Sequence, residues 1–203
     1  MFNIKSQFLF PKQLIISDDS NYPQYRNQLI ECCYEQMSND KVGAQYTNRG
    51  GWQSNAHSMM NDSKFSFFIE ILSQNIGECL KQEYQIIQNT TIDIPRIWIN
   101  ISGHNHYNTT HTHPMSHYTG VFYVKCPENC GNIIFNNGYN ANDYQECLYR
   151  ENEVMENNKI YPSCSYTPVE GRLILFPSCV PHLVEMNQSD SDRISISFDL
   201  LFR

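Results

Sequence analysis

The sequence of 203 residues has little that would suit a membrane, secreted or broadly nucleic-acid-binding protein. Basic residues are few, with 14 Lys and Arg against 21 Asp and Glu, and the formal net charge is −7. Because binding phosphate over a broad face needs a basic surface, nucleic acid is not an expected partner. Apolar runs such as Phe65–Leu72 and Leu173–Phe176 are too short or interrupted to span a bilayer, and the N-terminus lacks the pattern of a secretory signal. We therefore expect a soluble, cytoplasmic protein with no membrane partner.

The eight cysteines are spread along the chain and lack the density of a disulfide-stapled scaffold. In a reducing compartment, free thiols are the default state. Cys126 and Cys130 are close enough in sequence to provide half of a zinc site, but no second closely spaced pair accompanies them. Free thiols are therefore the expectation.

Two amphipathic patterns in the N-terminal part predict helices. The first helix is expected to begin after Ser20 or Asn21 as the capping residue, with Pro23 in its first turn. The second is expected to begin near Asp62 or Ser63. Apolar residues recur every three or four positions in both helices, at Tyr22, Tyr25, Leu29, Cys33 and Met37, and at Phe65, Phe68, Ile69, Leu72, Ile76 and Leu80. Such stripes are typical of helices that pack on a sheet.

From Ile92 onward, short β-rich runs alternate with Gly, Pro and Asn. The runs are Ile94–Ile101, Tyr118–Lys125, Asn132–Asn136, Arg172–Pro177 and Arg193–Phe202. Several short strands with turn signals are typical of a sandwich or barrel of jelly-roll type. No repeat and no linker separates two cores, so we expect a mainly β domain over residues 1–203, with residues 1–90 as helical support and residues 91–203 as the jelly-roll core.

Five of the seven histidines crowd into the segment from His104 to His117. Residues i and i+2 of a β-strand point to the same face, so the imidazoles of His111 and His113 could reach one metal ion. His182, which follows an apolar run, is the expected third ligand. Three imidazoles with open positions are typical of a catalytic metal centre, and imidazole suits Zn, Cu, Fe and Ni. The alternative is a polar, His-rich loop with no metal.

Arg193 heads the last alternating run, and Ser195 lies on the same face of that predicted strand. A guanidinium can form two parallel hydrogen bonds with a carboxylate, and a serine hydroxyl can add a third. An arginine near a metal site therefore suggests a co-substrate that chelates the metal and carries a distal carboxylate. The alternative for Arg193 is a surface salt bridge with Asp190 or Asp192.

Seven short motifs occur in order along the chain. They are Gly51–Ser54, Trp98–Asn100, His111–Pro114, Thr119–Val124, Gly171–Ser178, His182 and Arg193–Phe198. In this order and spacing, the chain from about residue 52 onward resembles a bacterial and phage branch of the 2-oxoglutarate and Fe(II)-dependent oxygenases, in the prolyl-4-hydroxylase-like superfamily. The resemblance implies a double-stranded β-helix of cupin-like type, in a protein that can be phage-encoded and act in a bacterial host. It also implies an enzyme that uses Fe(II), 2-oxoglutarate and O2 to hydroxylate an unknown substrate, with release of succinate and CO2.

The resemblance also implies roles for single residues. His111 matches the first iron ligand, His182 the distal histidine, and Arg193 the base that pairs with the C5 carboxylate of 2-oxoglutarate. Thr119 and Tyr123 match a Thr-x-x-x-Tyr pattern that also hydrogen-bonds 2-oxoglutarate, and their spacing keeps both on one face of a strand. Ser195 is expected to help Arg193 to hold the far end of the co-substrate.

The chain departs from the superfamily at His113, where Asp or Glu is usual. A neutral imidazole leaves the iron one negative charge short, although three-His iron sites exist among cupin-fold dioxygenases. Two arrangements therefore stay open, a three-His site and a two-ligand site with His113 turned aside. Two other functions also stay open: a cupin-like three-His metal enzyme that does not use 2-oxoglutarate, and a non-enzymatic jelly-roll binding module.

The substrate could be a small molecule, a peptide or a protein side chain, and a homodimer is the default assembly for such a domain. Trp52 lies in the aperiodic segment 50–54, which has two glycines and is predicted to be a loop. Taken alone, the segment suggests that Trp52 packs as an anchor. With the resemblance, Trp52 and the Asn-rich segment Asn136–Asn158 become the elements expected to cover the substrate.

Overall fold

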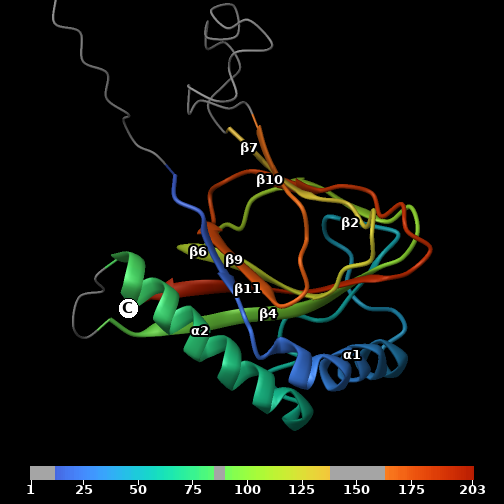
Figure 1. The fold of residues 1–203 in the computed structure, drawn as a ribbon, viewed down its shortest axis with the longest axis horizontal. Helices are drawn as coiled ribbons and strands as arrows, with labels where there is room; N and C mark the ends of the chain where they lie inside the picture. The colour runs from blue at the N-terminus through green and yellow to red at the C-terminus, as the bar shows by residue number, and fades with distance from the viewer. Residues whose placement is uncertain (1–11, 85–89, 138–162) are drawn as a thin grey trace, which may run out of the picture.

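The computed structural model describes residues 12–84, 90–137 and 163–203. These residues form two helices and two antiparallel sheets (Figure 1). The helices are α1 (Tyr22–Asn39) and α2 (Ser66–Tyr84), the second preceded by the 3-10 turn Ser63–Phe65. The larger sheet contains, in spatial order, β1 (Ile15–Asp18), β9 (Arg172–Pro177), β6 (Tyr118–Lys125), β11 (Arg193–Phe202), β4 (Ile92–Ser102) and β3 (Trp52–Gln53). The smaller sheet contains β2 (Asn48–Arg49), β5 (Tyr107–His111), β10 (His182–Val184), β7 (Ile133–Asn136) and β8 (Ser163–Tyr166).

The strands from β4 to β11 are divided between the two sheets. Strands β9, β6, β11 and β4 lie side by side in the larger sheet, and β5, β10, β7 and β8 lie side by side in the smaller one. Figure 1 shows both helices on one side of the larger sheet and strands β7, β10 and β2 on its other side. This arrangement confirms the predicted mainly β architecture with N-terminal helices packed on a sheet.

The main core lies between the helices and the larger sheet. One row of side chains on β11 faces the helices, because successive residues of a strand point to opposite faces. That row is apolar and completely buried, and it consists of Ile194, Ile196, Phe198 and Leu200. Buried residues of the helices pack against it, among them Leu29, Phe68, Leu72 and Ile76. The expected apolar stripes of both helices therefore form this core.

The opposite face of β11 looks into the space between the sheets. Its row is polar and lines a cavity, and it consists of Arg193, Ser195, Ser197 and Asp199. A second, smaller apolar cluster comes from β6, β7, β9 and the turn after β9, with Val121, Tyr123, Ile133, Phe135, Ile174, Phe176 and Val180. The polar row is therefore held between a large core on one side and a facing sheet on the other.

The segment with two glycines is only partly the loop that its sequence suggests, since Gly50, Gly51 and Ser54 lie outside the strands. Trp52 and Gln53 form the short strand β3, which pairs with β4. The Trp52 ring packs against the main core, and its indole N–H donates a hydrogen bond of 2.6 Å to the carbonyl of Asp40. Trp52 does not line the cavity, so the expectation that it covers the substrate is wrong and its anchoring role is confirmed. Nearly all of the segment 136–158 lies outside the described residues.

Two observations apply across the described residues. Their cysteines, including Cys126 and Cys130, form no disulfide. No helix of these segments combines the length and the apolar content that crossing a bilayer requires.

Gly120 tests the close packing of the larger sheet on the helices. A Cβ atom at this position of β6 would lie 2.4 Å from the Phe198 ring and 2.6 Å from Leu175. Because overpacking of a core costs roughly 1–3 kcal/mol, we expect Gly120→Ala to lower the free energy of unfolding by that amount in urea denaturation. Gly77→Ala in α2 is the matched control, because nothing lies within 4 Å of its Cβ position. It should raise the stability by about 0.5–1 kcal/mol, and equal effects of the two changes would contradict the packing described.

Candidate metal and co-substrate site

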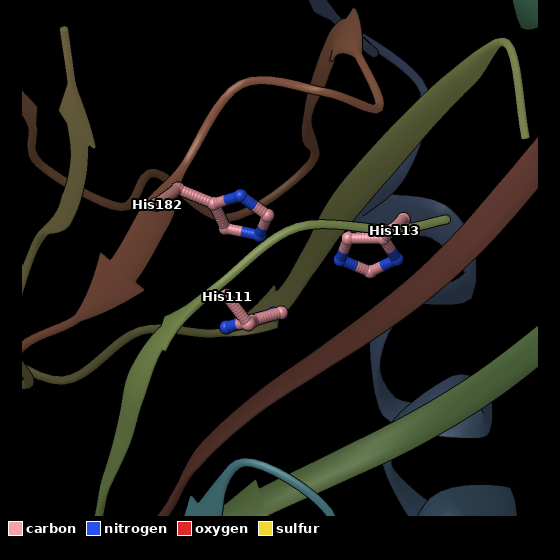
Figure 2. Close-up of side chains that lie close together, drawn as sticks. All are labelled: His111, His113 and His182. Carbon is pink, nitrogen blue, oxygen red and sulfur yellow. The ribbon is translucent and has the colours of Figure 1, made fainter. Parts of the chain in front are cut away.

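The three predicted metal ligands come together between the sheets. His182, the first residue of β10, pairs directly with His111, the last residue of β5. His113 lies two residues beyond the end of β5, where its backbone N–H donates to the carbonyl of Ser178 at 2.9 Å. One ring nitrogen of each histidine lies within 4.8 Å of the others (Figure 2). In the described part of the chain, this is the only such cluster of potential metal ligands.

The expectation that His111 and His113 share one strand is wrong. The ladder between β5 and β10 ends at the pair His111–His182, because β10 begins at His182 and offers no partner further along. The imidazole of His113 nevertheless reaches the cluster. Its ring stacks on two other rings. The centroid distance is 5.6 Å to Trp98 and 5.2 Å to His182.

Hydrogen bonds set which ring nitrogen of each histidine is free. The Nδ1 atom of His111 lies 2.7 Å from the carbonyl of Thr109, and that of His182 lies 3.0 Å from the carbonyl of Val180. A carbonyl only accepts hydrogen bonds, so Nδ1 carries the proton in both rings and Nε2 keeps its lone pair. Such outer hydrogen bonds are typical of histidines that bind a metal through the other nitrogen.

Burial keeps the same two imidazoles neutral. Loss of solvent, together with the smaller effect of the neighbouring His111, lowers the pKa of His182 to about 3. Burial likewise lowers the pKa of His111. A metal ligand must be deprotonated, so at neutral pH both side chains are in the form that binds a metal. Three clustered imidazoles fit a transition metal such as Fe(II), Ni or Zn.

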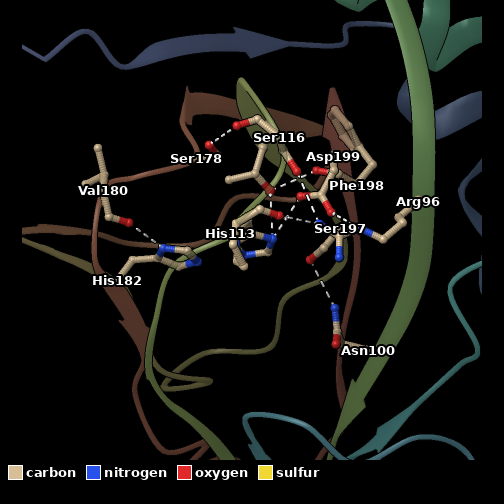
Figure 3. A network of polar contacts seen from close by, with 12 residues as sticks. Arg96, Asn100, His113, Ser116, Ser178, Val180, His182, Ser197, Phe198 and Asp199 are labelled. Carbon is tan, nitrogen blue, oxygen red and sulfur yellow. Dashed lines mark hydrogen bonds and ion pairs between the residues drawn. The ribbon is translucent and has the colours of Figure 1, made fainter. Parts of the chain in front are cut away.

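Two further residues contact His113 and were not recognised from the sequence. The Trp98 ring stacks on it, and the Oδ1 atom of Asp199 lies 2.9 Å from its Nδ1 atom (Figure 3). Asp199 is completely buried. The signal that could have found it is the alternation of β11, because Asp199 continues the row that begins with Arg193 and Ser195.

Arg193 is a buried cation, with 3% of its surface exposed. Its Nη1 atom donates to the carbonyl of Cys130 at 2.6 Å, and more weakly to Gly131 and Glu185. No carboxylate of residues 12–84, 90–137 or 163–203 pairs with it, so the surface salt bridge with Asp190 or Asp192 is excluded. Burial lowers the pKa of Arg193, but a guanidinium keeps its charge in proteins. Burying an unpaired charge is costly, so the geometry favours an anionic ligand here.

Two hydroxyl groups lie beside this guanidinium. Ser195 pairs across the sheet with Tyr123, and both line the cavity. Within the described segments, neither hydroxyl has a hydrogen-bond partner. Burial raises the pKa of Tyr123, so its phenol stays protonated and can donate. Three unfilled donor groups therefore face one end of the cavity, as a carboxylate site requires.

Thr119 stands apart from these donors. Its hydroxyl donates to the carbonyl of Phe198 at 2.8 Å and lies 3.4 Å from the Nδ1 atom of His113. The side chain lines the same cavity but is directed toward the metal cluster. Its expected contact with 2-oxoglutarate stays a prediction.

A single cavity of about 270 Å³ joins the histidine cluster to the buried arginine. His111, His113 and His182 line one part of it, and Arg193 and Tyr123 line another. A molecule in this cavity could contact a metal with one end and the guanidinium with the other. The geometry thus matches a chelating co-substrate with a distal carboxylate.

The other histidines of the crowded segment have local structural roles. His104 bonds the carbonyl of Ser189, His106 accepts a hydrogen bond from the N–H of Gly103, and His117 accepts one from Phe202. None of them belongs to the cluster, which agrees with the expectation that they are loop or supporting residues.

The cluster predicts which histidines matter for metal binding. We expect His111→Ala and His182→Ala to lose metal affinity by more than the roughly 10–100-fold that follows loss of an outer hydrogen-bond partner, because each removes a ligand. His57→Ala and His104→Ala change exposed histidines outside the cluster and should bind as the wild type does. Metal titration of protein purified without a polyhistidine tag checks this. Equal affinities in all four variants would show that the cluster is not the site.

The model of one protein family matches residues 96–199, about half of the chain. That family is described as "Putative 2OG-Fe(II) oxygenase". The matched segment runs from Arg96 to Asp199 and so contains every residue of the site just described. None of the curated proteins compared with the chain matches it.

Solved structures of low sequence identity share the fold. A prolyl-4-hydroxylase of Pseudomonas putida is 13% identical, with a TM-score of 0.59 over 93% of this chain and 92% of that one. The non-heme alpha-ketoglutarate-dependent carbocyclase SnoK from nogalamycin biosynthesis is 11% identical, with a TM-score of 0.66 over 93% and 79%. The collagen prolyl hydroxylase of Paramecium bursaria Chlorella virus-1, solved with 2-oxoglutarate, is 11% identical, with a TM-score of 0.56 over 92% and 94%. These likenesses confirm the predicted double-stranded β-helix.

Proposed function

The chain belongs to the 2OG-Fe(II) oxygenase family, and from this we propose how its own residues carry out the reaction. The protein is a 2-oxoglutarate- and Fe(II)-dependent dioxygenase. In our proposal His111, His113 and His182 hold the iron, and Arg193, Ser195 and Tyr123 hold the far carboxylate of 2-oxoglutarate. The observation that carries the proposal is one cavity with three clustered imidazoles in one part and, in another, a buried guanidinium that no described carboxylate pairs with.

Bound iron and 2-oxoglutarate together supply the oxidising chemistry, in which O2 is consumed, 2-oxoglutarate is cleaved to succinate and CO2, and one oxygen atom enters a C–H bond of the substrate. The protein contributes by holding the iron and the co-substrate in position. The outer hydrogen bonds of His111 and His182 fix their rings before the metal arrives, so little reorganisation is needed on binding.

The arginine end sets the orientation of the co-substrate. Arg193 is held in place by backbone carbonyls through Nη1, and no described residue accepts from its Nε or Nη2 atoms. A carboxylate between these atoms and the hydroxyls of Ser195 and Tyr123 would satisfy all of them. Because the surroundings are buried, water competes poorly for these donors, which favours a charged ligand of matching length.

The uncharged polar part of the cavity lining supports an uncharged, hydrogen-bonding substrate. It consists of amide and hydroxyl side chains, among them Gln53, Asn100, Asn108, Thr112 and Ser197. Of these, Asn100 donates to the hydroxyl of Ser197 at 3.1 Å. A polar group of a small molecule or of a protein side chain fits such a lining.

An anaerobic titration tests the function directly. One equivalent of Fe(II) followed by 2-oxoglutarate should produce the visible absorption band of 2-oxoglutarate chelated to Fe(II). Admission of O2 should then yield succinate even without a substrate. Iron binding with no band on addition of 2-oxoglutarate would instead support a metal enzyme of cupin type that does not use this co-substrate.

The arginine provides a second, independent prediction. We expect Arg193→Lys to weaken 2-oxoglutarate binding by about tenfold or more, because a hydrogen bond to a charged group contributes roughly 1.5–3 kcal/mol. Iron binding should be unchanged. Arg172→Lys is the matched control, since Arg172 pairs with Asp18 at the edge of the larger sheet and does not line the cavity. The dependence of succinate formation on 2-oxoglutarate concentration checks both variants, and equal KM values would contradict the assignment.

A further inference from the structure

One of the three histidines has a different outer partner from the other two. The Nδ1 atoms of His111 and His182 face neutral backbone carbonyls, whereas that of His113 faces the carboxylate of Asp199 at 2.9 Å. His113 is also the residue that stands where a carboxylate ligand is usual in this superfamily. The site therefore contains a carboxylate after all, on the outer side of the His113 ring and outside the set of expected metal ligands.

We propose that Asp199 is a positioning residue of the metal centre: it fixes the tautomer and orientation of His113 and supplies, through that imidazole, the negative charge that a carboxylate ligand would supply directly. This inference rests on the proposed function, in which His113 binds the metal.

The register of β11 with its two neighbouring strands fixes the position of Asp199. In β11 it pairs with Thr119 of β6 on one side and with Arg96 of β4 on the other. It is completely buried, so its charge is tolerated only if both oxygens have partners. Oδ1 faces His113, and Oδ2 forms an ion pair of 2.6 Å with Nε of Arg96 (Figure 3).

Asp199 forms an ion pair with Arg96, and a carboxylate in an ion pair only accepts hydrogen bonds. The proton between the two side chains therefore belongs to Nδ1 of His113, and Nε2 is left with its lone pair. The hydroxyl of Thr119, 3.4 Å from the same Nδ1 atom, donates to a backbone carbonyl and so offers His113 only a lone pair. All the polar contacts of this ring thus select one tautomer.

Water screens the charge of Arg96 more than it screens the charge of Asp199. The Arg96 side chain is 40% exposed, so water weakens its field, whereas Asp199 is fully enclosed beside the cavity. A carboxylate behind a metal-bound histidine raises the basicity of the imidazole, and loss of such an outer partner typically costs 10–100-fold in metal affinity. Arg96 also donates to the carbonyl of Pro114 and the hydroxyl of Ser116, both at 3.2 Å, and thereby ties the segment after His113 to the same network.

The test uses Co(II) as the metal and the full chain, with affinity measured from the visible absorption of the bound ion. Asp199→Asn keeps the size of the side chain and an oxygen that can accept from His113, but it removes the charge. We expect it to bind Co(II) about tenfold or more weakly than the wild type, and Asp199→Ala to bind at least as weakly. Asp93→Asn, which changes a half-buried carboxylate paired with Arg203 outside the site, should stay within twofold of the wild type.

A second readout follows the tautomer of His113 in the apo-protein. In the wild type, the 15N chemical shifts of His113 should show the proton on Nδ1, and in Asp199→Ala the two tautomers should mix. Arg96→Gln leaves the contact between His113 and Asp199 in place, so its loss of Co(II) affinity should be smaller than that of Asp199→Asn. This variant also keeps the test decisive if a change of Asp199 prevents folding.

Three results would overturn the inference. Asp199→Asn could bind Co(II) as tightly as the wild type, the tautomer of His113 could be unchanged in Asp199→Ala, or Arg96→Gln could weaken Co(II) binding as much as Asp199→Asn does. The last result would make Asp199 an anchor for Arg96 and its loop. Failure of the wild-type protein itself to bind one equivalent of Co(II) would overturn the metal site, and the inference with it.

Discussion

The two-residue alternation of β11 is the constraint on which the rest of the structure depends. Its apolar row, Ile194 to Leu200, packs in the main core, and its polar row, Arg193 to Asp199, lines one side of the cavity. Any shift of register by one residue would exchange the two rows and put a guanidinium and a carboxylate into the core. Because β4 and β6 hold this strand on both sides, packing of the helices and placement of the site are secured by the same interactions.

Contacts within the protein itself fix the arrangement of the site. The cross-strand pair of His182 with His111 brings two ligands together from distant parts of the sequence. Acceptors on the outer side of each ring, two carbonyls and one carboxylate, leave the same nitrogen free in all three histidines. At the other end, the buried guanidinium lacks an anionic partner in the described part of the chain. Burial of that charge costs stability, so binding of an anion to the guanidinium should raise the free energy of unfolding.

Much of this arrangement could be predicted from the sequence, and the part that could not has physical reasons. The helices, the long strands and the group formed by His111, His182 and Arg193 follow from periodicity and motif order, which are local properties of the chain. Strand β10 has only three residues, too few for any alternation to be visible, and β3 is shorter still. The end of β5 at His111 depends on where its partner begins, which is a tertiary property. Asp199 is one of the alternating polar positions of β11, and the fold shows that it faces His113.

A crystal structure of the protein grown without oxygen, with Fe(II) and 2-oxoglutarate bound, tests the central claim most directly. The account predicts that the Nε2 atoms of His111, His113 and His182 contact the iron and that the distal carboxylate lies against Arg193, with Tyr123 and Ser195 beside it. Iron held by His111 and His182 alone, with His113 turned away, would contradict the three-histidine site. A 2-oxoglutarate molecule that leaves the guanidinium unpaired would contradict the co-substrate site.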